Sequence, residues 1–447
     1  MSIFFLLIIS IAILTVLGRL VYFKLYINLR GIFLISIIII SLLGLLMISL
    51  YTFDNMIHFN QIDMPGDAMH YFNRALEYIC SNNLDTGKAK SYVFFISKFL
   101  IKTNAFFIRI AQLFLFILIY IASSYLLGKF RISKKGFILF SSLLVPNGIY
   151  YGIITPTERD IFLLLFYVLA LILLALIMKN YLDKNLFSFS SLRMFIILSV
   201  VLFVMNDLQF FSVFSVLIAF ICCCIYFLII SNRSLLNKIL FLILSSSIVL
   251  VSVLFFLNLD YLIYSIMADL IGETGRREVI SLSGTGAVES NLLLATFRFV
   301  LGPGLIRPLF PELFFNTYTN MSAFFYFWGT VVWYTNIILT LPLIIKNPFK
   351  IFNNPASIMI LIFLFIFVVV YSLHFGGASG MRKRAVVHFF YTVLIVNTYY
   401  TKYNYESMKV KIHFNNLKKI LKCIPHLLVS ALTSLLLIFV NLRGLSY

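Results

Sequence analysis

Long apolar stretches recur along the whole chain and are separated by short polar segments. Many are close to twenty residues long, the length that an α-helix needs to cross a hydrocarbon core of about 30 Å. A membrane β-barrel would instead show short strands in which apolar and polar residues alternate. The pattern therefore predicts an all-α polytopic membrane protein. About 12 transmembrane helices are expected, at 2–22, 31–52, 104–127, 137–154, 160–178, 192–206, 208–230, 239–258, 321–345, 356–373, 385–400 and 424–441.

Composition agrees with this class. The chain has 447 residues, of which 62% are hydrophobic and 11% are charged, whereas a soluble globular protein carries roughly 25% charged residues. The formal charge of +19 is spread over short loops. Control of topology and contact with anionic lipid in the bilayer explain such scattered cations, so no nucleic acid partner is expected.

The basic loops fall on one side of the membrane if the spans alternate in direction. The positive-inside rule makes that side cytoplasmic. All acidic residues except Asp183 and Glu406 then lie on the outer side or at outer span ends. Two explanations stay open, namely the solubility of two long outer loops and chemistry on the outer face of a multi-pass protein of the cytoplasmic membrane.

The two long outer loops are expected at 53–103 and 259–320. Neither is long enough for an independent domain with a sizeable core. Both contain apolar residues at helical spacing, which predicts amphipathic helices on the membrane surface. The chain 1–447 is therefore expected to form a single transmembrane domain.

In the first outer loop, residues 67–79 predict an amphipathic helix that begins after the turn signal Pro65-Gly66. The expected apolar face carries Ala68, Phe72, Ala75, Leu76 and Ile79. The expected polar face carries Asp67, His70, Tyr71, Arg74, Glu77 and Tyr78.

This polar face has the chemistry of a substrate site. Asp67 is a candidate general base, or simply the N-cap of the helix. Arg74 could hold a phosphate oxygen, and Tyr71 could stack on a sugar ring. His70 is interpreted as a residue of the polar face and not as a metal ligand, because no second His, Cys or carboxylate stands at ligand spacing.

A second cluster lies in "GIYYGIITPTERD" at 148–160. Glu158, Arg159 and Asp160 enter a predicted span, and ionisable residues there are costly, which makes them functional candidates. The alternative is an interfacial ion pair that caps the helix after Pro156.

Two further sets lie in the second outer loop. Arg276 and Arg277, within "GETGRREVISLSGTGAVES", could contact an anion or could sit on a solvated loop tip. Arg307, within "RFVLGPGLIRPLF", lies among apolar residues, which suits a lipid headgroup.

The segment "HFGGASGMRKRAVVHFF" at 374–390 carries Arg382, Lys383 and Arg384 on the predicted outer side, against the positive-inside bias. Guanidinium groups bind phosphate bidentately, so an anionic ligand is expected here. The other interpretation is that the topology is wrong by one span. His374 and His388 flank the set and are possible proton carriers.

No metal site is predicted, because the cysteines and histidines show no ligand spacing. No cofactor is expected, although the sequence leaves dependence on a divalent metal open.

Four features together resemble bacterial GT-C glycosyltransferases and Wzy-like polysaccharide (O-antigen or capsule) polymerases. They are "GDxxxYxxxA" from Gly66, the amphipathic helices before the next span, the "PTERD" turn, and "GxxxxRxR" from Gly377. The resemblance implies that Asp67 is the catalytic base or orients the acceptor. It also implies that Arg382 and Arg384 bind a polyprenyl phosphate. The chain departs from the family in having no Asp-x-Asp or Asp-Glu pair in the first loop and no soluble outer domain.

The expected function is a glycosyltransferase or polymerase that builds a cell-surface polysaccharide from polyprenyl-(pyro)phosphate-linked saccharides at the outer face, with glycan-assembly proteins as possible partners. Alternatives are a single-sugar transferase with a polyprenyl-phosphate donor, a flippase for the same lipid, and a membrane acyltransferase with a histidine base. The large outer loops and the lack of repeated halves count against the flippase.

Overall fold

The computed structural model describes residues 3–59, 67–81, 89–99, 105–155, 159–182, 189–208, 210–230, 296, 299–300, 320–375 and 381–402. Within them the regular elements are helices, besides one isolated antiparallel bridge between Ile132 and Thr401. The predicted all-helical class is confirmed. The helices are α1 (Ile3–Lys24), α2 (Ile27–Phe59), α3 (Asp67–Ser81), α4 (Lys90–Ser97), α5 (Phe106–Lys129), α6 (Lys134–Leu144), α7 (Gly148–Ile154), α8 (Asp160–Leu182), α9 (Phe189–Leu208), α10 (Phe210–Ile230), α16 (Asn320–Lys346), the 3₁₀ helix η1 (Pro348–Asn353), α17 (Pro355–Phe375) and α18 (Met381–Tyr399).

The helices follow the apolar stretches, because a backbone in lipid must satisfy its own hydrogen bonds. Five helices of the described residues are long and apolar enough to cross a membrane, and a bent pair could add a sixth. The predicted spans at 239–258 and 424–441 lie outside the described residues. The count of about twelve spans stays a prediction.

One predicted span, 137–154, consists of two helices. α6 and α7 meet at an angle of 49°, with Pro146 in the break. A proline restricts the residue before it and cannot donate a backbone hydrogen bond, so a helix ends readily at this point. Asn147 then caps α7, since its Oδ1 accepts from the backbone N–H of Ile149 at 3.1 Å.

α7 packs closely on α16 through two glycines. A Cβ added at Gly148 would lie 2.9 Å from the backbone oxygen of Phe325, and one at Gly329 would lie 2.8 Å from the backbone nitrogen of Ile149. The two backbones therefore touch, and no larger residue fits at either position without a shift.

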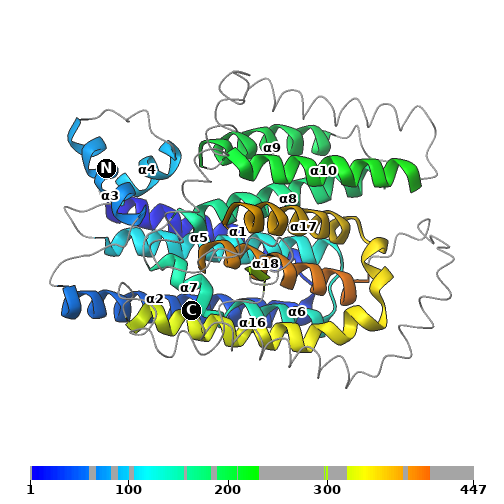
Figure 1. Ribbon diagram of the computed structural model, residues 1–447, viewed down its shortest axis with the longest axis horizontal. Helices are drawn as coiled ribbons and strands as arrows, with labels where there is room; N and C mark the ends of the chain where they lie inside the picture. The colour runs from blue at the N-terminus through cyan, green and yellow to red at the C-terminus, as the bar shows by residue number, and fades with distance from the viewer. Residues whose placement is uncertain are drawn as a thin grey trace.

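The long helices run side by side as a bundle (Figure 1). α5, α8, α17 and α18 pass through its middle, α9 and α10 lie along one side, and α2, α16, α6 and α7 lie along the other. α1 packs on α5 and leaves most of its apolar side chains exposed, as expected of a helix that faces lipid. The short helices α3 and α4 lie at one end of the bundle.

At one end of the bundle, called here the basic end, loops from three regions meet. The backbone N–H of Ser133 donates to the carbonyl of Tyr400 at 2.7 Å, and that of Lys402 donates to the carbonyl of Arg131 at 3.2 Å. Nζ of Lys350 donates to the carbonyl of Tyr399 at 3.1 Å. The basic loops after α5, after α16 and after α18 thus lie together, as the alternation of spans predicts.

The opposite end is called here the site end. It is formed by the first turns of α5, α8 and α18, the last turns of α2, α7 and α9, and the helices α3 and α4. Hydrogen bonds and ring contacts connect these elements. The candidate residues of α3, of residues 159–160 and of the first turn of α18 come from this end.

Candidate functional site

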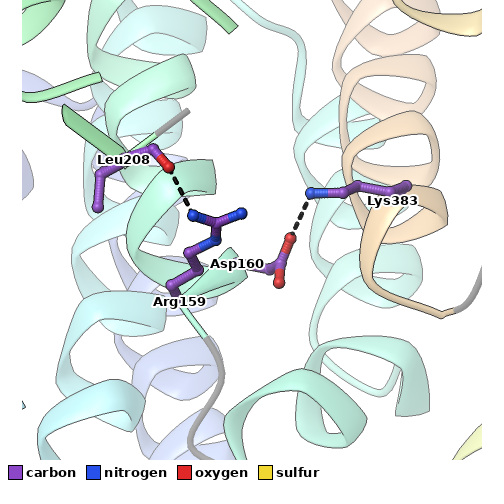
Figure 2. A network of polar contacts seen from close by, with 4 residues as sticks. All are labelled: Arg159, Asp160, Leu208 and Lys383. Atoms are coloured by element: carbon purple, nitrogen blue, oxygen red, sulfur yellow. Dashed lines mark hydrogen bonds and ion pairs between the residues drawn. The ribbon is translucent and has the colours of Figure 1, made fainter. Parts of the chain in front are cut away.

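An ion pair between a buried carboxylate and a partly buried ammonium joins the first turns of α8 and α18 at the site end (Figure 2). Nζ of Lys383 lies 2.8 Å from Oδ1 of Asp160, and their side chains are 13% and 4% exposed. The residues are 223 positions apart, so packing of the two helices creates the pair. Desolvation of two charges is costly, which makes this pair a candidate for function.

Arg159 lies directly before α8 and connects the start of that helix to two other elements. Its Nη1 donates to the carbonyl of Leu208, the last residue of α9, at 2.7 Å (Figure 2). Its guanidinium carbon lies 5.5 Å from the centre of the Tyr71 ring on α3, a distance typical of cation–π contacts. Arg159 therefore helps to hold α3 over the site end.

Asp207 anchors α4 to the bundle. Its carboxylate oxygens accept from the backbone N–H groups of Lys90 at 3.2 Å and Ser91 at 2.7 Å. Its backbone oxygen accepts from the N–H of Ala89 at 2.9 Å. A carboxylate at a helix N-terminus satisfies otherwise unpaired donors and complements the helix dipole. The last turn of α9 thus holds α4, which lies within the predicted first outer loop, against the bundle.

The helix predicted at 67–79 is present as α3 and begins at Asp67, as expected. In the structure, the residues of its predicted polar face are partly buried in the protein and partly exposed. Tyr71 and Arg74 are buried against the bundle, whereas His70 and Glu77 are exposed. Ile79, on the predicted apolar face, is 50% exposed. The inward face of α3 is therefore rotated towards Tyr71 and Arg74, because it packs on α4 and contacts Arg159.

The cations before the last predicted span lie in a helix. α18 begins at Met381, so Arg382, Lys383 and Arg384 form its first turn instead of a loop that ends at 384. Arg384 is buried, and its Nε donates to the carbonyl of Phe299 at 3.2 Å. Phe299, within the predicted second outer loop, therefore contacts the bundle at this point.

Arg109, in the first turn of α5, was not a candidate from the sequence. It is 2% exposed. Its Nε donates to the carbonyl of Thr155 at 2.7 Å and its Nη1 to Oγ1 of Thr52 at 2.7 Å, while its guanidinium lies 5.0 Å from the Tyr51 ring centre. One arginine thus holds together α2, α5 and the end of α7. An ionisable residue within an apolar span was the signal that could have identified it.

The buried charged side chains of the described residues are Asp160, Arg74, Arg109 and Arg384. Each comes from an element of the site end, where Lys383 and Arg159 also lie. The arrangement can neutralise an anion, since guanidinium and ammonium groups donate charge-assisted hydrogen bonds to phosphate oxygens.

Several predicted residues have side chains outside the described part. For Asp67, His374 and Arg382 the structure describes the backbone, at the start of α3, in the last turn of α17 and in the first turn of α18. The candidates that lie wholly outside the described residues are Glu158, Arg276, Arg277 and Arg307.

The part of the chain that the structure describes contains no group of three His, Cys, Asp or Glu side chains that could hold a metal ion. The charged groups of the site end are, in these described residues, mostly cations.

Comparisons with protein-family models, with curated proteins and with solved structures return no match for this chain.

Proposed function

We propose that the protein is a membrane glycosyltransferase or polymerase that uses polyprenyl-(pyro)phosphate-linked saccharides at the outer face of the cytoplasmic membrane. One observation carries the proposal. Arg159, which directly precedes α8, and Lys383 and Arg384 of α18 lie at the same end of the apolar bundle as the buried arginines of α3 and α5, opposite the basic loops. That end would lie at the level of lipid headgroups on the outer side, if the basic loops are cytoplasmic.

The proposed reaction needs such a charge arrangement. The acceptor hydroxyl oxygen bonds to the anomeric carbon, the bond from that carbon to the phosphate oxygen breaks, and the hydroxyl proton goes to a base. The departing lipid pyrophosphate or phosphate gains negative charge. Preorganised cations in a water-poor site stabilise that charge strongly. Lys383 and Arg384 are assigned to this role.

The base is assigned among the acidic residues of the site end. Asp160 accepts a hydrogen bond from Lys383 at 2.8 Å, so its main role in this ion pair is to orient the ammonium of Lys383. Asp67 therefore remains the first choice for the base, with Glu158 as the next.

The test uses the purified full chain in lipid nanodiscs with a polyprenyl-pyrophosphate-linked saccharide. Longer lipid-linked glycan identifies a polymerase, and the addition of one residue from a polyprenyl-phosphate sugar identifies a single-sugar transferase. In a parallel assay the chain is reconstituted in lipid vesicles, where movement of the lipid across the bilayer without a new glycosidic bond would identify a flippase and overturn the proposal. The proposal would also be wrong if the protein neither bound nor converted any lipid-linked sugar of a tested panel.

A further inference from the structure

α16 and α18 face each other through a row of polar and aromatic side chains, called here the α16–α18 seam. The indole of Trp333 stacks on the imidazole of His388, with ring centres 4.1 Å apart and planes at 10°. One turn further, Nδ2 of Asn336 donates to Oγ1 of Thr392 at 2.8 Å. Trp333, Asn336, His388 and Thr392 are all buried.

The seam contains polar atoms that lack hydrogen bonds. Both ring nitrogens of His388 and Oδ1 of Asn336 are buried and have no hydrogen-bond partner within the described part of the chain. The amide orientation of Asn336 follows from its neighbour. Thr392 donates its hydroxyl proton to the carbonyl of His388 at 2.8 Å, so its oxygen must accept from Nδ2, which leaves Oδ1 unused.

These three atoms define what the seam can bind. A neutral imidazole offers one N–H donor and one acceptor, and the amide oxygen is an acceptor. A ligand must therefore supply donors as well as an acceptor. A phosphate supplies acceptors alone, whereas a hydroxyl group is both a donor and an acceptor. Buried polar atoms without partners are costly, so native proteins usually satisfy them.

The seam also lies next to the proposed phosphate contact. His388 is four residues after Arg384, so both lie on the same face of α18, one turn apart. Along α18, the cation of Arg384 thus lies nearer the site end, and the hydroxyl-binding group of His388 lies deeper in the bundle.

We propose that the α16–α18 seam binds hydroxyl groups of the saccharide whose phosphate contacts Arg384, with His388 and Asn336 as hydrogen-bonding residues. This inference rests on the proposed function and adds to it the place of the sugar. His388 is a binding residue in this assignment and takes no proton in the reaction.

The test compares two lipids on the purified full chain in nanodiscs, a polyprenyl pyrophosphate that carries a saccharide and the same lipid without sugar. His388→Phe is the main variant, because a phenyl ring keeps the stack on Trp333 and removes both nitrogens. It should bind the sugar-bearing lipid roughly tenfold or more weakly and the sugarless lipid as the wild type does. Thermal unfolding without ligand should be unchanged or slightly higher.

Asn336→Leu is the second variant and should show the same selective loss if His388→Phe fails to fold. Tyr120→Phe is the matched control. Its hydroxyl bonds to Oγ of Ser141 at 2.9 Å in the α5–α6 contact, so its removal should weaken neither lipid.

Each other outcome is decisive. Equal binding of the sugar-bearing lipid by wild type and His388→Phe would overturn the inference and leave the proposed function standing. An equal loss for both lipids would also overturn it, since the seam would then act through the phosphate contact or the fold. A wild-type protein that binds neither lipid would remove the proposed function itself.

Discussion

Removal of one partner of the Asp160–Lys383 pair should destabilise the protein strongly. At 2.8 Å the Coulomb attraction of two unit charges is about 6 kcal/mol for an effective dielectric constant of about 20, and about 1.5 kcal/mol in water. Much of this Coulomb attraction offsets the cost of desolvating the two charges. A lone charge left at a buried site keeps its desolvation cost and has no attraction to offset it. Asp160→Asn and Lys383→Met should each therefore lower the free energy of unfolding by about 3 kcal/mol.

The double variant separates the pair from its surroundings. Asp160→Asn with Lys383→Met leaves no charge at either position, so its cost should be smaller than the sum of the two single costs. We expect a coupling energy of about 2 kcal/mol from the double-mutant cycle. Unfolding would be followed by tryptophan fluorescence of the purified protein in mixed micelles with increasing denaturing detergent.

Two results would refute this reasoning. Single variants that unfold like the wild type would mean that the charges are not held together in a buried place. Additive single effects, with a coupling energy below about 0.5 kcal/mol, would mean that the residues act independently.

Three further predictions concern other elements. Arg109→Lys should lower the free energy of unfolding by about 2 kcal/mol, because a compact ammonium lacks the planar fork with which the guanidinium reaches the two separate acceptors. An unchanged value in the same assay would contradict the role of Arg109 in holding α2, α5 and the end of α7 together. Gly148→Ala and Gly329→Ala should each destabilise by about 1–3 kcal/mol through overpacking, while Gly31→Ala, which has open space around its Cβ, should not. Asp67→Asn should lower the rate of sugar transfer on the order of 10²-fold if Asp67 is the base. Since Asn caps helices about as well as Asp, near-normal turnover by Asp67→Asn would return Asp67 to a capping role.

Helices whose boundaries depend on local signals were predictable. α3 begins at Asp67, directly after Pro65-Gly66, because turn residues and an N-cap type define a helix start from neighbours alone. The long apolar runs likewise appear as helices in the described residues. The break between α6 and α7 was missed, although Pro146 was visible, because the whole stretch 137–154 is apolar enough for one span.

The partners within the site were not predictable in the same way. Guanidinium chemistry favoured Arg382 and Arg384 over Lys383, yet Lys383 pairs with Asp160. Consecutive residues of a helix point about 100° apart, so the sequence alone does not tell which of three adjacent cations meets α8. The packing of α8 against α18 brings Lys383 to Asp160. Arg109 was passed over because its partners, Thr52 and Thr155, are remote in sequence.

The first turn of α18 opposes two local rules at once. Cations at a helix N-terminus are disfavoured by the helix dipole, and the helix has no acidic residue there. Cations on the predicted outer side also oppose the positive-inside bias. Asp160 and the carbonyl of Phe299 offset part of this cost for Lys383 and Arg384. A sequence that breaks consistent local preferences usually does so at a functional site, and under the proposed function the anionic substrate would make adjacent cations favourable at this position.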